Sequence, residues 1–413
     1  MSRSDAPSAV PGAHLSDAAD RRARTAALAC MIGLAVALGV GRFAFTPLLP
    51  LMLADGSIGL KAGSWLASAN YAGYFVGAVS CAALKIAPAR MVRIGLAATV
   101  LLTAAMGVGH LLPVWLVVRF VAGVVSAWTF VFVSQWGLRR LTELHAPEWG
   151  GVIYAGPGVG IVLTGLIGSA LAGHRAAPGW LGFAALSAVL SVVIWRIFGD
   201  APVAAAGQPA VSARQAATAA APADARRHRA DAAWLVVLYG MPGFGYIITA
   251  TFLPVIARAA LPAGSPWPDL FWPMFGAALI VGAIAAARLP GHWDNRLLLA
   301  AGCATQALGI AAGIVWPNAA GFSVGSALLG LPFTAITLFA MREARRLHGE
   351  RAAGLMGYAT ASYGVGQILG PLVAAPLTAH FGSFSPALGV AAAALLVGAA
   401  GFAATAARGR ARP

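Results

Sequence analysis

Apolar segments long enough to cross a lipid bilayer follow one another along the whole chain. A membrane-spanning helix needs about 20 apolar residues, and 59% of the 413 residues are hydrophobic while only 10% are charged. A soluble domain carries about 25% charged residues. No soluble fold could cover this much apolar surface, so the sequence predicts an all-α integral membrane protein. The twelve predicted spans lie at about 25–55, 62–84, 91–111, 113–138, 149–173, 179–198, 232–257, 269–288, 297–316, 318–341, 352–378 and 383–406.

The spans form two groups of six, separated by a stretch that has no sustained apolar face. That stretch is rich in Ala and Pro, a composition typical of a flexible tether. The N-terminal residues are polar, and the apolar run after them is too long for the h-region of a signal peptide, so we expect a retained tail. The predicted parts are a cytoplasmic tail at 1–24, a six-helix bundle at 25–198, a flexible cytoplasmic linker at 199–230, a second bundle at 231–406 and a cytoplasmic tail at 407–413.

The positions of the 28 Lys and Arg residues predict the orientation, because cytoplasmic loops carry an excess of these residues. If the N-terminus is cytoplasmic, only Lys61, Arg175 and Arg258 fall on the outside, and Arg42 and Arg119 lie within the membrane. We therefore expect a bacterial inner-membrane protein with both termini in the cytoplasm. The net charge of +15 then reflects topology and contact with anionic lipids on that side, so no nucleic-acid partner is expected.

The first and second groups of spans share a glycine and proline pattern. Six spans per half make each half start on the same side, so the repeats are parallel and face each other across a central cavity. Arg42 of the first half is replaced by Tyr246 in the second, which makes the polar interior asymmetric. The matching pairs in spans 1 and 7 are Gly39 with Gly243, Gly41 with Gly245, Leu49 with Leu253 and Pro50 with Pro254.

Arg42 is the charged residue of the first span, between two glycines and two prolines. An Arg inside a membrane helix costs at least ~2.5 kcal/mol by insertion scales, so its side chain must face protein, water or ligand. Two interpretations stay open for Arg42: contact with a ligand or gate, and structural pairing with backbone carbonyls and a Tyr. The same two alternatives stay open for Arg119 in the fourth span.

Polar side chains at helical spacing add candidates for a substrate site. Asn70 and Tyr74 are four residues apart and share one face of the second span. The alternative for each Tyr is ordinary packing. The candidate substrate-binding residues are Arg42, Asn70, Tyr74, Arg119, Tyr154, Tyr246, Tyr358 and Gln367. The candidate hinge and gating residues are Gly39, Gly41, Pro47, Pro50, Gly156, Pro157 and Asp294.

Several motifs resemble those of major facilitator superfamily transporters over almost the full chain. Arg119–Gly123 is similar to the family's span-4 motif, Ala155–Gly160 to the Gly-Pro motif typical of antiporters, and Gly364–Pro371 to its span-11 counterpart. Gly41–Pro50 together with Ala69–Tyr74 resembles the YbfB/YjiJ group of that superfamily. The resemblance implies two six-helix bundles that work by alternating access, with the substrate near the midplane between them.

One loop departs from the family pattern. The family usually has an acidic residue among bases between spans 2 and 3, where it latches one closed state. Here the loop Lys85–Arg93 keeps its bases and has no acid, whereas the loop Arg288–Arg296 contains Asp294. We therefore expect the charge latch mainly in the second half; ordinary interfacial charges are the alternative.

Residues that would carry enzymatic or proton-relay chemistry are missing from the predicted spans. Every Asp and Glu falls in a tail, in a loop or at a span end, and the His residues lie in or near loops. Cys30, Cys81 and Cys303 are far apart and have no metal-ligand spacing. No catalytic triad or metal motif is present, so we expect no enzyme, no cofactor and no metal.

The sequence therefore predicts a monomeric secondary active transporter. Two buried cations without a buried acid favour a small organic anion as substrate, and the antiporter-like motif favours export. The alternative is a proton-coupled exporter of neutral or apolar compounds, such as drugs or sugars, for which Glu148 or Asp294 would have to carry the proton. A receptor or scaffold that does not transport is a more remote alternative.

Overall fold

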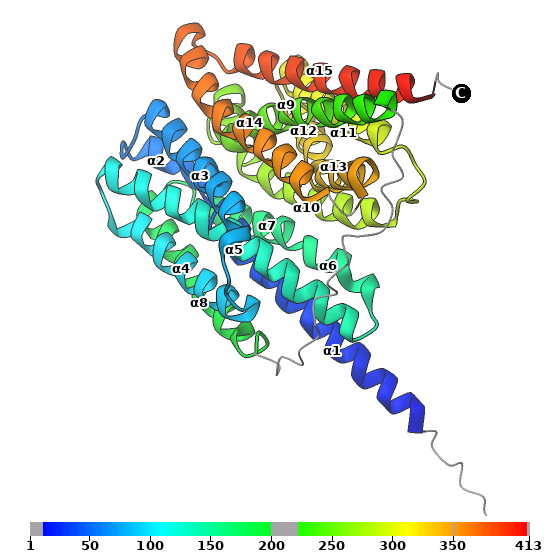
Figure 1. The fold of residues 1–413 in the computed structure, drawn as a ribbon. Coiled ribbons are helices and arrows are strands. Elements are labelled where there is room, and N and C mark those ends of the chain that lie inside the picture. Colours follow the sequence, from blue (N-terminus) through cyan, green and yellow to red (C-terminus); the bar gives the residue numbers. More distant parts are fainter. Residues whose placement is uncertain (1–10, 200–221, 350–351, 411–413) are drawn as a thin grey trace, which may run out of the picture.

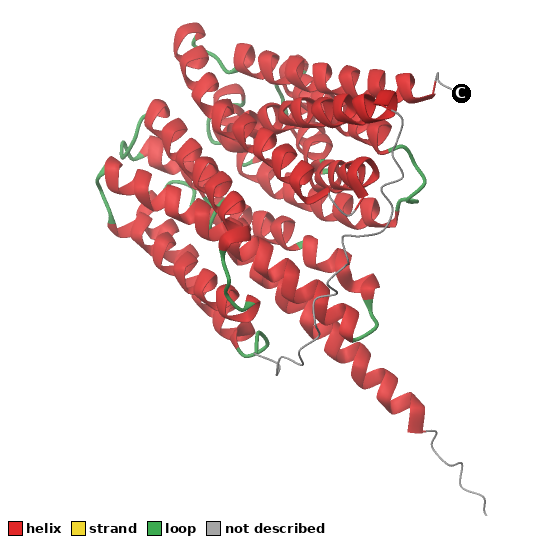
Figure 2. Ribbon diagram, viewed as in Figure 1, coloured by secondary structure: helices red, strands yellow, loops and turns green. Residues whose placement is uncertain are grey.

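The structure, a computed structural model, describes residues 11–199, 222–349 and 352–410 (Figure 1). All regular elements within these ranges are helices (Figure 2). The prediction of an all-α fold with two bundles is confirmed, and Figure 1 shows the bundles packed side by side. The tail and linker predictions fall partly on residues 1–10, 200–221 and 411–413, which lie outside the described residues.

The first bundle contains a first span that is broken into pieces and five further spans. Its helices are α1 (Pro11–Leu34), the π-helix η1 (Ala35–Val40), α2 (Phe45–Ala54), α3 (Leu60–Ser80), η2 (Cys81–Ala83), α4 (Pro88–Val108), α5 (Leu112–Glu143), η3 (Pro147–Trp149), α6 (Gly150–Tyr154), α7 (Gly156–Ala170) and α8 (Ala176–Trp195).

The second bundle follows the linker and has an unbroken first span, whereas its fourth span is divided into two helices. Its helices are α9 (Pro222–Ala260), α10 (Trp267–Arg288), α11 (Asn295–Val315), α12 (Ala319–Gly330), α13 (Phe333–His348), α14 (Ala352–Phe381) and α15 (Ser385–Arg410). Two helices begin earlier than the predicted spans. Residues 11–24 of the predicted tail belong to α1, and residues 222–230 of the predicted linker belong to α9.

Ten helices of the described chain are long and apolar enough to cross a membrane. The helices of the second and eleventh predicted spans, α3 and α14, are not among these ten. They pack against each other across the two halves, where Ser68 Oγ donates a hydrogen bond of 2.8 Å to the Ile368 carbonyl. Their place between the bundles accounts for their more polar sequences. The exact number of twelve spans stays a prediction.

The first span is interrupted where Arg42 lies. In the wide turn that ends η1, the Gly41 N–H bonds to Val36 O and the Phe43 N–H to Leu38 O, both at 3.0 Å. Pro47 contributes to this break, because a proline has no N–H to donate and its ring clashes with the carbonyl four residues earlier. Such π-turns frequently lie at functional sites. The break lies among the predicted hinge residues Gly39, Gly41 and Pro47, and their function as a hinge stays a prediction.

Close packing between the broken span and α7 depends on glycine. A Cβ atom at Gly39 would overlap the backbone of Gly160, so only glycine lets these two segments approach. α7 in turn packs against α10 of the second half. Small residues allow close packing of membrane helices in this way, and the broken span lies next to the boundary between the halves.

Hydrogen bonds join the two halves at one side of the molecule. Thr46 Oγ1 of α2 donates to the Ala250 carbonyl of α9 at 2.9 Å, and the Tyr71 and Thr251 hydroxyls share a hydrogen bond of 2.9 Å. The opposite side, here named the basic face, holds the N-terminal part of α1, the start of α4 and the end of α5, together with the start of α11 and the end of α13. The free end of α1 and the C-terminal end of α15 both point to this side (right in Figure 1).

Candidate functional site

The Arg42 side chain lies among aromatic rings in the interior of the molecule. Only 4% of the residue is exposed. Its guanidinium carbon is 4.2 Å from the ring centre of Tyr74, 5.1 Å from that of Tyr71 and 5.2 Å from that of Phe43. A cation over an aromatic face gains ~0.5–1 kcal/mol at exposed sites and about 2 when desolvated. The rings thus hold the charge of Arg42 without neutralising it.

Two nitrogen atoms of Arg42 have no acceptor from the protein. Nε and one terminal nitrogen are buried, and no described side chain or backbone group accepts a hydrogen bond from either. The ion pairs of the described residues involve other arginines. A buried donor that lacks an acceptor costs about 1–3 kcal/mol, and more when it is charged. Arg42 therefore presents a buried positive charge with unused donors.

Arg119 has a different environment, since it bonds to the backbone of the broken span. It is 2% exposed, and its terminal nitrogens donate to the carbonyls of Gly41 at 3.4 Å and Arg42 at 3.2 Å. Its guanidinium also lies 4.9 Å from the ring centre of Phe45. Arg119 supports the irregular turn that carries Arg42, which favours the structural interpretation of this residue.

Asn70 links the helices around these two arginines. Its side-chain amide donates a hydrogen bond of 2.9 Å to the carbonyl of Arg119, and the residue is fully buried. Its own side-chain oxygen has no described donor. The structure thus brings four predicted residues together, namely Arg42, Asn70, Tyr74 and Arg119.

Tyr246 and Gln367 form a second polar group in the other half. Gln367 Nε2 donates a hydrogen bond to the Tyr246 hydroxyl, and both residues are buried. The Tyr246 ring stacks on Tyr363 with centres 5.9 Å apart. Phe333 connects this group to the first half, because its ring centre is 4.9 Å from Tyr246 and 6.4 Å from Phe43.

Two predicted residues lie apart from these groups. Tyr154 packs against Phe130 of α5, with ring centres 6.2 Å apart, and Tyr358 is 71% exposed. Neither has a described hydrogen bond, ring contact or cation contact with Arg42 or Tyr246. A role for them in the same site requires a different arrangement of the halves.

The predicted hinge in the fifth span coincides with a break between helices. α6 ends at Tyr154 and α7 begins at Gly156, with Pro157 in its first turn. A Cβ atom at Gly156 would overlap the carbonyl oxygen of Met31 in α1. Gly156 is therefore required for the close approach of α7 to the first span, and its function as a hinge stays a prediction.

Asp294 takes part in a charge cluster on the basic face. It caps the N-terminus of α11, accepting a hydrogen bond of 3.0 Å from the Arg296 backbone N–H, and its other oxygen lies 3.0 Å from the Arg296 guanidinium. Burial raises the pKa of Asp294, but the hydrogen bonds and the charge of Arg296 outweigh it and hold that pKa below its ordinary value.

The cluster also contains an acid that the sequence analysis left among span-end residues. Glu343 of α13 is 2% exposed, bonds to Arg346 at 2.7 Å and lies 3.9 Å from Arg296. The three-residue spacing of Glu343 and Arg346 was the available sequence signal, because such residues are neighbours on a helix. The cluster ties α11 to α13 within the second half, and none of its described ion pairs crosses to the first half.

Sequence reasoning also missed Tyr71, Phe43 and Phe333. These residues surround the Arg42 guanidinium or connect it to the second half. Tyr71 lies three residues before Tyr74, a spacing that also makes two side chains neighbours on a helix, but the sequence analysis used only the four-residue pair of Asn70 and Tyr74.

A family model described as uncharacterised MFS-type transporter YbfB matches residues 34–402. The chain belongs to this family of major facilitator superfamily transporters. The match spans both bundles and the broken first span, so the Arg42 group lies inside a transporter fold. The protein is therefore an integral membrane transporter and not a member of an enzyme family.

Solved structures with the same fold include two of the nucleoside transporter NupG. A structure of a NupG mutant has 16% sequence identity and a TM-score of 0.67, and the match covers 92% of this chain and 99% of that chain. A second NupG structure has 14% identity and a TM-score of 0.67, with 93% and 98% covered. At this identity the likeness shows the fold alone. No curated protein matches the chain.

Proposed function

We propose that this YbfB-family transporter is a secondary active transporter that moves a small organic anion by alternating access. The observation that carries the proposal is the Arg42 guanidinium, buried among three aromatic rings with two nitrogens that have no acceptor from the described residues. A carboxylate or similar group would provide those acceptors, since such groups bind the planar fork of an Arg with two hydrogen bonds.

The hydrogen bonds between the halves support a cycle in which the basic face opens; helix packing of α6 against α10 lies nearer to that face. The described hydrogen bonds between the halves lie toward the side away from that face, at Thr46, Tyr71 and Ser68. We take the basic face as cytoplasmic, in the bacterial inner membrane, because basic residues gather there. Opening of this face would give a cytoplasmic anion access to Tyr74 and Arg42.

Efflux is the proposed direction. The inside-negative membrane potential drives an anion outward by about 2.3 kcal/mol per charge per 100 mV. An anion exporter thus needs no proton relay within the membrane, which agrees with the span-end positions of the acidic residues in the sequence.

A neutral solute is the second candidate. Three aromatic rings lie in sequence from one half to the other, namely Phe43, Phe333 and Tyr246, and Gln367 is hydrogen-bonded to Tyr246. This group would suit a ligand that stacks on aromatic rings and accepts hydrogen bonds. NupG, which shares the fold, is described as a nucleoside transporter.

Flux measurements in proteoliposomes test both candidates. Purified protein would be reconstituted and assayed for counterflow of labelled organic anions and labelled nucleosides, with an imposed potential of either sign. The proposal predicts anion flux that increases when the potential drives the anion out of the vesicle. Flux of nucleosides alone, insensitive to potential, would favour the neutral-solute candidate instead.

A further inference from the structure

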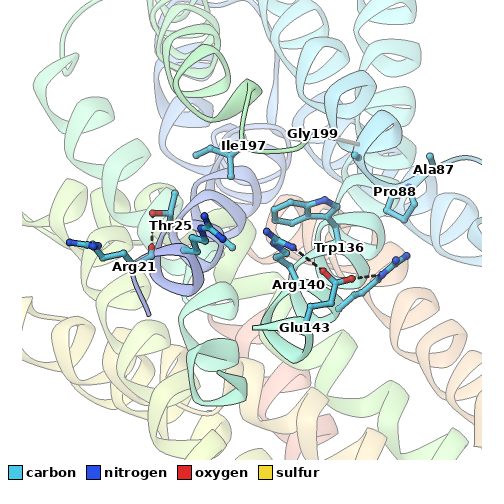
Figure 3. Close-up of a pocket in the computed structure, with 13 residues that line it drawn as sticks. Arg21, Thr25, Ala87, Pro88, Trp136, Arg140, Glu143, Ile197 and Gly199 are labelled. Carbon is cyan, nitrogen blue, oxygen red and sulfur yellow. Dashed lines mark hydrogen bonds and ion pairs between the residues drawn. The ribbon is translucent and has the colours of Figure 1, made fainter. Parts of the chain in front are cut away.

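The first half contains a basic cavity that the proposed transport function does not use. It has a volume of about 670 Å³ and lies on the basic face, between the N-terminal part of α1, the start of α4, the end of α5 and the residues that follow α8 (Figure 3). Four arginines line it: Arg21, Arg22, Arg139 and Arg140. Such a concentration of guanidinium groups is a typical binding site for phosphate.

Glu143 is the acid among the described lining residues of this cavity. It is shared between two of the arginines, since its carboxylate lies 2.9 Å from Arg139 and 3.0 Å from Arg140 (Figure 3). One carboxylate cannot neutralise four guanidinium groups. The cavity therefore keeps an excess of positive charge, with Arg21 and Arg22 on its α1 wall.

The corresponding cavity in the second half is also lined by four arginines and one acid, Asp294, and it has the further buried acid Glu343 beside it. There the start of α11 and the end of α13 line the cavity, and Asp294 caps α11 and pairs with Arg296, while Glu343 pairs with Arg346. Among the described ion pairs, Glu343 with Arg296 at 3.9 Å is the one that joins the two helices.

Neither acid has an equivalent in the first half. Ala87 occupies the N-cap position of α4 and makes no side-chain hydrogen bond there. Asp294 occupies the corresponding position of α11 and does make one. The turn of α5 that corresponds to Glu343 contains Trp136 and Gly137. Each half thus has a cavity of similar volume lined by arginines, about 670 Å³ in the first half and about 660 Å³ in the second, and the first half lacks carboxylates at the positions of Asp294 and Glu343.

We propose that this cavity binds a phosphate-bearing anion, the headgroup phosphate of an anionic membrane lipid, which takes the place of the missing carboxylates and ties α1 to α4 and α5. Trp136 lines the cavity, and Trp is enriched at the membrane–water interface. On α1 the stripe Arg21, Thr25 and Leu28 leads from the cavity into the apolar zone, and Leu28 is 41% exposed. A headgroup in the cavity would place an acyl chain along this stripe.

The test is the thermal unfolding midpoint of the full chain in neutral detergent. Phosphatidylglycerol, phosphatidylcholine and inorganic phosphate would be titrated separately at constant ionic strength. The proposal predicts that phosphatidylglycerol raises the midpoint by several degrees more than phosphatidylcholine does. A response to inorganic phosphate without an added effect of phosphatidylglycerol would support the same site with a free anion as its source.

Arg22→Gln and Arg24→Gln form a matched pair of variants. Both residues are exposed on α1 and lie two positions apart, but only Arg22 lines the cavity. The proposal predicts that Arg22→Gln weakens the apparent affinity for phosphatidylglycerol about tenfold, as expected for one hydrogen bond to a charged group, while Arg24→Gln retains the response of the wild type.

Ala87→Asp gives an independent check, because it adds a carboxylate at the position that Asp294 occupies in the second half. We expect a higher midpoint without lipid and a smaller response to phosphatidylglycerol. The proposal is overturned if neither anion stabilises the wild type beyond phosphatidylcholine, or if Arg22→Gln responds to the lipid as Arg24→Gln does.

Discussion

The Arg119 guanidinium donates a hydrogen bond to the main-chain carbonyl of Arg42, 3.2 Å away, so one buried cation holds the turn that positions the other. The two arginines therefore have separate tasks. Both terminal nitrogens of Arg119 donate to the backbone of the broken span, and only its Nε lacks an acceptor among the described residues. Arg42 has two such nitrogens, which we propose for a ligand.

Replacing Arg119 should mainly destabilise the protein. Arg119→Gln removes the donors to two buried carbonyls, each of which costs about 1–3 kcal/mol when left without a partner. We expect a loss of about 3 kcal/mol in the free energy of unfolding, seen as a lower thermal midpoint. Arg408→Gln is the control, because it removes the same charge from an exposed position. Equal midpoints for the two variants would contradict the structural role.

Gly39 tests the close packing of the broken span against α7. A methyl group at this position would overlap the backbone of Gly160, and overpacking of a well-packed site typically costs about 1–3 kcal/mol. We expect Gly39→Ala to lower both the thermal midpoint and the transport rate. Gly182→Ala is the matched control, since a Cβ there meets open space. A fully active and stable Gly39→Ala variant would show that the contact is dispensable.

The pH dependence of stability should report the Asp294–Arg296 pair. The pKa of Asp294 is held below its ordinary value in the folded protein, so its contribution is present above the unfolded pKa and is lost as pH falls through the folded pKa. With an ordinary value of about 3.9, the stabilisation is complete at pH 7 and disappears below about pH 4.

The measurement is the thermal midpoint of wild type and of Asp294→Asn, each recorded at pH 7 and at pH 3. Asp294→Asn should be less stable than wild type at pH 7, and the difference should shrink under acid conditions. A difference that stays constant between pH 7 and pH 3 would argue against an ionised carboxylate as the source of the stabilisation.

Orientation in the membrane can be tested by cysteine labelling in intact cells. Position 215 lies in the predicted linker and position 175 in a predicted outside loop. An impermeant thiol reagent should label Arg175→Cys and should leave Gln215→Cys unlabelled until the cells are opened. Labelling of position 215 from outside would reverse the proposed topology.

The position and irregularity of the first span could be predicted from the sequence, because they depend on local chemistry. A long apolar run gives a membrane helix, and Pro47 disrupts the backbone bonding of the residues before it. The hydrogen bond from Arg119 to the Arg42 carbonyl could not be predicted in this way. It joins segments 77 residues apart and depends on how α5 packs against the broken turn.

The sequence also could not decide which polar residues of the spans face the site. Tyr74 and Tyr154 were both selected as polar residues within spans, yet only Tyr74 covers the Arg42 guanidinium, while Tyr154 packs within its own half against Phe130. Successive helix positions point about 100° apart, so the rotation of each helix about its axis decides which side chain faces the site. That rotation follows from tertiary packing and not from local sequence.

We propose that Arg42 binds the negative charge of the substrate, and the substrate affinity of Arg42 variants measures this contact. Once a transported anion has been identified by flux, its affinity would be measured on monodisperse wild type, Arg42→Lys and Arg42→Gln, with thermal midpoints recorded alongside. Arg42→Lys should bind weakly, because the charge survives and the planar fork is lost. Arg42→Gln should bind at least about 100-fold more weakly than wild type, since it loses a charged hydrogen-bonding partner worth about 3 kcal/mol. Equal affinities for wild type and Arg42→Gln, with both proteins folded, would contradict the anion site and favour a neutral substrate.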